Sequence, residues 1–279
     1  MDRRPAWLWP NLLSLDAPLV AVAWFWMFTK AWRVVWLPDL LPLLVGCAVW
    51  CVYVGDRLMD VREKAAGGPR TSPRHQFHAK HRKLLTVLLV IGGVVCVSIL
   101  AVLPLSLWAH GALILLFVIT YFFVSLLYDG EGIPVVKNFF AGMTFSYGTA
   151  VGIHFYRPES DLFYFFLKSP EVILFGFLCV LNMTAIDIWE EARRRQAEKR
   201  VADVVFSICL LSVAGAALLF AANADDYTKA FLLSVMFAAG ALYLVDRIGR
   251  FWSLDVQRVM ADVAMLLPLP FFIFRTWNL

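Results

Sequence analysis

YVGDRLMDVREKAAGGPRTSPRHQFHAKHRK, residues 53–83, joins the end of a long apolar run to a dense cluster of basic residues. Two aspartates, Asp56 and Asp60, stand four residues apart where the apolar run ends. At this spacing both side chains project from one face of a helix. The stretch therefore raises the question of which ligand a carboxylate pair followed by arginines would bind at the edge of an apolar segment.

The composition of the chain is that of a membrane protein. Hydrophobic residues make up 61%, charged residues only 16%, and the mean hydropathy is +0.72. These values exclude an ordinary soluble domain, in which about 25% of the residues are charged. A bilayer core takes roughly 20 helical residues to cross, and lipid offers no partners for backbone groups. Apolar runs of that length are therefore expected to be helices.

Nine apolar runs divide the chain, and the short links between them indicate a single domain over residues 1–279. The runs lie near 16–37, 39–59, 84–107, 109–129, 134–153, 170–189, 201–222, 227–247 and 259–276. Residues 5–14, rich in Trp and Leu, are typical of an amphipathic segment at the membrane interface. The sequence thus predicts an all-α fold, a polytopic bundle of nine transmembrane helices.

The basic residues predict the orientation of this bundle. With nine spans, 19 of the 25 Lys and Arg residues fall on the side of the N-terminus, and six fall on the other. Positive charge is retained in the cytoplasm. We therefore expect a multi-pass protein of a bacterial inner membrane, with a cytoplasmic N-terminus and an extracytoplasmic C-terminus. The net charge of +4 reflects this topology and does not indicate nucleic-acid binding.

A second carboxylate pair stands at the end of the sixth run. LCVLNMTAIDIWEEARRRQAEKR, residues 178–200, places Asp187 and Glu191 four residues apart and again ahead of basic residues. The parity of the spans puts both pairs on the same side of the membrane. Four converging carboxylates would repel one another unless a cation lay between them, and Mg²⁺ prefers carboxylate, water and phosphate oxygens. The alternative is that these charged helix ends are simply solvated.

The two pairs and their flanking residues resemble the UbiA superfamily of intramembrane prenyltransferases. That family is similar in having nine transmembrane helices, a cytoplasm-facing cavity, and Asp-rich motifs after helices two and six. DRLMD supplies Asp56 and Asp60, and RTSPRH at 70–75 resembles the family's diphosphate-binding element with Arg70, Thr71 and Arg74. YDGEGIPVVKNFFAG at 128–142 offers the family's Tyr, Lys and Gly as Tyr128, Lys137 and Gly142.

The resemblance implies a function. Asp56, Asp60, Asp187 and Glu191 would hold Mg²⁺ against the diphosphate of an isoprenyl diphosphate at the cytoplasmic rim. Arg70, Arg74, Tyr128 and Lys137 would contact this substrate, while its prenyl chain would lie among the helices. The prenyl group would then pass to a lipophilic, aromatic acceptor. A UbiA-type terpene cyclase that needs no acceptor, and a non-catalytic membrane relative, are the alternatives.

Three further groups of residues allow two interpretations each. Asn182, one turn before the second pair, would line the cavity or form a hydrogen bond between helices. HQFHAKH at 75–81 spaces three histidines three apart, which indicates a loop helix bordering the site or, alternatively, a transition-metal site. The five cysteines all lie in predicted spans, and we interpret them as small packing residues.

Overall fold

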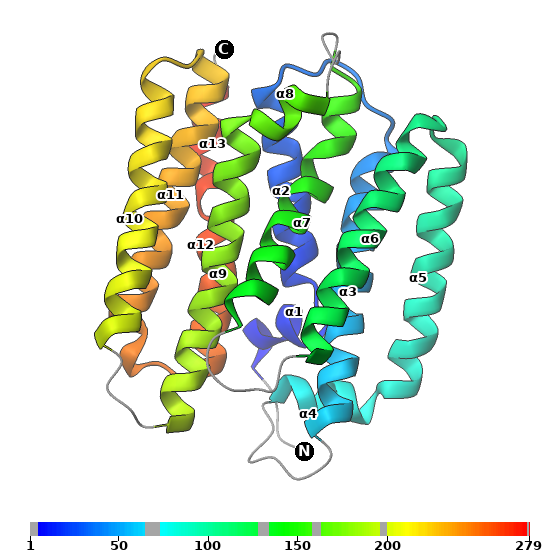
Figure 1. Cartoon of the computed structure of the whole chain (residues 1–279), viewed down its shortest axis with the longest axis vertical. Helices are drawn as coiled ribbons and strands as arrows, with labels where there is room; N and C mark the ends of the chain where they lie inside the picture. Colours follow the sequence, from blue (N-terminus) through cyan, green and yellow to red (C-terminus); the bar gives the residue numbers. More distant parts are fainter. Residues whose placement is uncertain (1–4, 65–72, 128–133, 158–162, 196–199, 278) are drawn as a thin grey trace.

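The computed structural model describes residues 5–64, 73–127, 134–157, 163–195, 200–277 and 279. Within these residues all regular secondary structure is helical, so the predicted all-α class is confirmed. The long helices stand side by side along one axis of the molecule (Figure 1). Their long-range contacts are therefore helix–helix packing contacts.

The elements follow the predicted apolar runs along the chain. In order they are η1 (Ala6–Leu8), α1 (Trp9–Leu12), α2 (Asp16–Ala31), α3 (Leu40–Lys64), α4 (Pro73–Lys80), α5 (Arg82–Val102), α6 (Ser106–Leu127), α7 (Val135–Phe155), α8 (Phe163–Lys168), α9 (Pro170–Arg195), α10 (Arg200–Ala222), α11 (Asp226–Ile248), η2 (Gly249–Phe251), α12 (Leu254–Leu266) and α13 (Pro268–Thr276).

Seven helical segments are long and apolar enough to cross a membrane, which makes this a multi-pass membrane protein. An eighth span arises if Ala6–Leu12 and Asp16–Ala31, which are bent by 81° relative to each other, count as one broken segment. The predicted run at 134–153 forms α7, whose polar residues and glycines keep it out of these seven. The last predicted run is divided into α12 and α13 at Pro268, because proline cannot donate a helical backbone hydrogen bond.

Aromatic side chains around α2 fill the centre of the bundle. Trp24, Phe28, Phe175 and Phe231, from α2, α9 and α11, are fully buried. The rings of Trp24 and Phe175 stack with their centroids 4.3 Å apart, and the Trp24 indole donates a hydrogen bond to the Met265 carbonyl at 2.9 Å. This hydrogen bond satisfies the polar end of a large apolar side chain. The cluster therefore ties α2, α9, α11 and α12 into one core.

Helices α7 and α9 approach one another closely at Gly142, the glycine of the YDGEGIPVVKNFFAG stretch. A Cβ atom at this position would lie 2.5 Å from the backbone nitrogen of Val180 on α9. Because the obstacle is backbone, a side-chain rearrangement cannot make room for it. Only glycine permits this separation of the two helices, and α7 is in turn the helix that reaches the carboxylates described below.

Replacement of Gly142 by alanine tests this close approach. We expect Gly142→Ala to lower the free energy of unfolding by about 2–3 kcal/mol, because the added methyl group must push α7 away from α9. Gly148→Ala on the same helix is the matched control, since its nearest neighbour would be the Ile114 Cδ1 atom at 4.0 Å. That control should be neutral, or stabilising by up to about 1 kcal/mol. Equal thermal unfolding midpoints for the two variants in detergent would contradict the proposed contact.

Candidate functional site

The first carboxylate of the DRLMD pair meets two other helices at the end of the bundle. Asp56 on α3 accepts a hydrogen bond through Oδ1 from the Tyr121 hydroxyl of α6 at 2.5 Å. The Lys137 ammonium of α7 lies 3.6 Å from the same oxygen and 5.3 Å from the Tyr121 ring centroid. The Asp56 side chain is 27% exposed, so a ligand can reach it. Asp56 is thus a paired but accessible carboxylate.

The first carboxylate of the second pair contacts the very next residue of α7. The Asn138 side chain donates a hydrogen bond to Asp187 Oδ2 at 2.7 Å and lies 3.3 Å from the Thr184 hydroxyl. Asn138 itself is 5% exposed. Two consecutive residues, Lys137 and Asn138, therefore hold one carboxylate from each motif. The start of α7 is the point at which the two sequence motifs meet.

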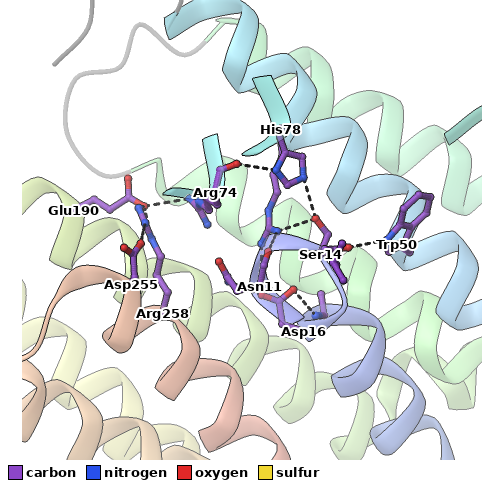
Figure 2. A network of polar contacts seen from close by, with 12 residues as sticks. Asn11, Ser14, Asp16, Trp50, Arg74, His78, Glu190, Asp255 and Arg258 are labelled. Atoms are coloured by element: carbon purple, nitrogen blue, oxygen red, sulfur yellow. Dashed lines mark hydrogen bonds and ion pairs between the residues drawn. The ribbon is translucent and has the colours of Figure 1, made fainter. Parts of the chain in front are cut away.

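Glu190, for which the sequence suggested no role, connects α9 to two other helices. It forms an ion pair with Arg258 of α12, whose Nε donates to Glu190 Oε1 at 3.1 Å. Arg74 of α4 lies 3.4 Å from the same oxygen (Figure 2). Glu191, the predicted site residue, is half-buried on the same helix. Two consecutive glutamates, Glu190 and Glu191, follow Asp187 in the sequence, and either could have been considered. The i, i+4 spacing from Asp187 selected only Glu191.

Several predicted site residues lie outside the part of the chain that the structure describes. They are Arg70 and Tyr128, together with the side chain of Asp60. Their roles stay predictions. Arg74, by contrast, sits on α4, which is the loop helix that the HQFHAKH spacing predicted.

A buried arginine beside Asp56 fixes the bend between α1 and α2. Arg57 is 4% exposed and donates hydrogen bonds to the Asn11 carbonyl at 2.5 Å and to the Ser14 hydroxyl at 2.7 Å. It also lies 3.5 Å from a carboxylate oxygen of Asp16, to which the Asn11 amide donates at 2.6 Å. Ser14 takes a positive φ of 57°, which is costly for a residue other than glycine. The contacts with Arg57 compensate this cost and hold the N-terminal segment against the site.

His78 of α4 continues this network to the α9 side (Figure 2). Its Nδ1 lies 2.9 Å from the Arg74 carbonyl oxygen, which can only accept, so Nδ1 carries the proton. Nε2 is then the acceptor for the Ser14 hydroxyl at 3.3 Å. Burial lowers the pKa of His78 to about 4, and the charges of Arg57 and Arg74 act in the same direction. The imidazole is therefore neutral at physiological pH.

A small cavity, lined mostly by apolar side chains, lies inside the bundle about one helical turn from the two motifs. Its volume is about 20 Å³, enough for one water molecule or a hydroxyl group. Tyr53 lines it three residues before Asp56, and Asn182 lines it from α9. The Asn182 carbonyl oxygen is buried and accepts no hydrogen bond among the described residues. Whether Asn182 also lines a substrate cavity stays a prediction.

Asp262 of α12 forms another wall of this cavity and was missed by the sequence analysis. It lines the cavity together with Asn182. An ionisable residue inside a membrane span is a functional candidate by default. The position of Asp262 within the apolar run at 259–276 is the feature of the sequence that could have identified it as a candidate.

Three of the cysteines form the one group of candidate metal ligands that lie close together among the described residues. The sulfur atoms of Cys47, Cys51 and Cys96 lie within 4.8 Å of one another. A Cβ atom on Gly92 would come within 2.7 Å of the Cys51 sulfur, so the glycine makes room for the thiols. The cluster joins α3 to α5.

The carboxylates of Asp56 and Asp187 suit a metal ion that is shared with a ligand. In the described part of the chain they form no closed cage with a third carboxylate. Mg²⁺ is held in this way in many phosphate sites, by one or two carboxylates together with phosphate oxygens and water. Asp56 Oδ2 and Asp187 Oδ1 accept no hydrogen bond from a described residue, so each remains available as a ligand.

Comparison with protein-family models, with curated proteins and with solved structures finds no match to this chain. The interpretation of the site therefore depends on its own geometry.

The neutral His78 predicts a dependence of stability on pH. The pKa of His78 is about 4 in the folded protein, against an ordinary 6.5 in the unfolded chain. Between pH 4 and pH 6.5 the unfolded chain therefore binds more protons at His78 than the folded protein does. The contribution of the neutral His78 to the free energy of unfolding is fully present above pH 6.5 and is lost as the pH falls through 4. His78→Asn keeps a donor for the Arg74 carbonyl but does not titrate. The thermal midpoint in detergent should fall more steeply on acidification to about pH 4.5 in the wild type than in this variant; parallel curves would refute the assignment.

Proposed function

We propose that the chain is a Mg²⁺-dependent intramembrane prenyltransferase of the UbiA type. It would ionise an isoprenyl diphosphate and transfer the prenyl group to a lipophilic, aromatic acceptor within the bilayer. One observation supports this proposal above all. Lys137 and Asn138, adjacent on α7, contact the leading carboxylates of two motifs that are far apart in the sequence. The spacing of each motif had already suggested diphosphate chemistry.

Asp56 and Asp187, with Asp60 and Glu191 as expected further ligands, would hold the magnesium. The ion would supply positive charge to the diphosphate oxygens. Lys137 and Arg74 would add positive charge at the same end of the bundle. As the C–O bond breaks, its electron pair leaves with the diphosphate, so these cations would stabilise the transition state more than the ground state.

The α7 residues would also position the carboxylates. Asn138 donates to Asp187 Oδ2 and would direct the other oxygen, Oδ1, toward the metal. The Tyr121 hydroxyl, which donates to Asp56 Oδ1, would direct Asp56 Oδ2 in the same way. Hydrogen bonds of this kind around metal ligands fix their orientation and are costly to remove. Tyr121 and Asn138 therefore join the site as positioning residues.

The allylic cation needs a dry, apolar surrounding in transfer and in cyclisation alike. Transfer to an aromatic ring forms a carbon–carbon bond and releases the ring proton. The released diphosphate, a base that the reaction itself supplies, would accept that proton. The side-chain oxygen of Asn182, which accepts no hydrogen bond from a described residue, would accept one from a hydroxyl group of the acceptor.

We infer that the site faces the cytoplasm, as the distribution of basic residues predicts. The ends of α3 and α9 that carry the motifs lie at the same end of the molecule as α4 (Figure 1). A reporter fused after Leu279 should then be detected on the extracytoplasmic side. A cytoplasmic signal would reject this orientation.

Replacing Asp56 or Asp187 by asparagine tests the proposed activity. Each change keeps the side-chain volume and the hydrogen-bond acceptor but removes one charge from the metal site. We expect Mg²⁺-dependent release of diphosphate from C10–C20 prenyl diphosphates to fall by roughly 100-fold or more, with nearly unchanged thermal stability. Asp226→Asn, an exposed carboxylate at the start of α11, is the control and should behave as wild type.

The same assay separates the candidate functions. Release that requires a phenolic acceptor would support the transferase, and release with a cyclic hydrocarbon product in its absence would identify a cyclase. No release with any of these substrates, or normal release by both asparagine variants, would refute the proposed function.

A further inference from the structure

A cleft separate from the carboxylate motifs opens between α9 and the α10–α12 side of the bundle. Its volume is about 560 Å³, within the range of small-molecule sites. Helices α7 and α10 lie on opposite sides of α9 in Figure 1, so this cleft and the motif carboxylates use different faces of α9. The lining residues are Ile188, Trp189, Ala192, Arg193, Asp203, Asp246, Arg250, Phe251, Trp252 and Gln257.

The cleft lies at the level of the lipid headgroups. Arg193 and Phe251 are the last residues of two candidate spans, and Asp203 is the second residue of another. Phe251 is 92% exposed, and Trp252 follows it. Aromatic side chains at span ends are typical of the membrane–water interface. A phospholipid beside the protein would therefore place its phosphate next to this cleft.

Charges of both signs line the cleft without neutralising each other. The side chains of Asp203 and Arg250 form no hydrogen bond or ion pair with any residue in the described ranges, although they share this one cleft. Arg193 donates through Nη2 to the Gln257 side chain at 3.0 Å and to the Trp252 carbonyl, which leaves the donors on Nε and Nη1 available. An unpaired carboxylate and an unpaired guanidinium in one cleft match a ligand that itself carries both charges.

A buried carboxylate adds negative charge at the base of the cleft. Asp246 is 6% exposed, and its Oδ1 accepts a hydrogen bond from the Trp189 indole at 2.9 Å. Its Oδ2 accepts no hydrogen bond among the described residues; the Nε of Arg247, 3.9 Å away, is at ion-pair distance only. Asp246 therefore reinforces Asp203 as the negative side of the cleft, and Arg193 and Arg250 form the positive side.

We propose that this cleft binds the headgroup of a zwitterionic phospholipid that carries a primary ammonium group, a phosphoethanolamine. Arg250 and Arg193 bind the phosphate, because guanidinium groups suit phosphate oxygens. Asp203 accepts hydrogen bonds from the ammonium, with Asp246 behind it. A choline headgroup has the same charges but no N–H donor, so it cannot form the contact with Asp203. A dianionic or more highly charged ligand would be repelled by the two carboxylates.

Native mass spectrometry of the delipidated, full-length protein with phosphatidylethanolamine, phosphatidylcholine and phosphatidylglycerol of identical acyl chains tests this site. We expect phosphatidylethanolamine to bind about tenfold more tightly than phosphatidylcholine, the effect of a charge-assisted hydrogen bond. Asp203→Asn should remove this preference and leave phosphatidylcholine binding unchanged. Arg250→Gln should weaken both lipids alike, by roughly fivefold.

Two variants at the opposite end of the bundle serve as matched controls. Asp226→Asn and Arg275→Gln each remove an exposed charge that has no partner among the described residues, and both should bind as wild type. Equal binding of ethanolamine and choline lipids by the wild type, or the same lipid preference in Asp203→Asn as in Asp226→Asn, would overturn the proposal. So would equally tight binding of free O-phosphoethanolamine, since the ligand would then be a soluble compound. The assay uses no prenyl substrate, so its result is independent of the proposed transferase activity.

Discussion

The contact between α7 and α9 determines how the carboxylates of this membrane protein are arranged. Charged side chains in a bilayer need partners, because their desolvation is expensive. Gly142 lets the backbones of α7 and α9 approach. The approach places Asn138 on Asp187 of α9, and Lys137, one residue earlier, reaches Asp56 of α3 on the other side. A single helix start thus connects two motifs that have no direct contact in the described structure.

A second polar network holds the N-terminal segment under the same end of the bundle. Arg57 satisfies the Asn11 carbonyl, the Ser14 hydroxyl and the Asp16 carboxylate, and His78 extends the network to α4. Because Arg57 immediately follows Asp56, movement of the N-terminal bend and movement of the first motif are coupled through one turn of α3. On the opposite side, the ion pair between Glu190 and Arg258 joins α9 to α12. Polar contacts therefore hold the helices on both sides of the site.

The sequence predicted the features that depend on local spacing. Apolar run lengths located the helices, and i, i+4 spacing selected Asp56 and Asp187, which do share α7 as a neighbour. It did not predict features that depend on side-chain direction across helices. The contacts of Glu190 with Arg258 and of Asn138 with Asp187 had no signal in the spacing. Arg57, which was counted only as a topology signal, binds the α1–α2 bend. Such pairings depend on helix rotation, which one sequence does not specify.

The central claim, that Asp56 and Asp187 share one metal-bound diphosphate, is tested most directly by pulsed EPR with Mn²⁺ in place of Mg²⁺. In the presence of a non-hydrolysable prenyl thiodiphosphate, the account predicts Mn²⁺ bound to the protein with phosphorus hyperfine coupling from the diphosphate. It also predicts that this coupled signal is lost in both Asp56→Asn and Asp187→Asn, because one ion depends on carboxylates from both motifs. Protein-bound Mn²⁺ without phosphorus coupling, or a coupled signal that survives in either variant, would contradict it.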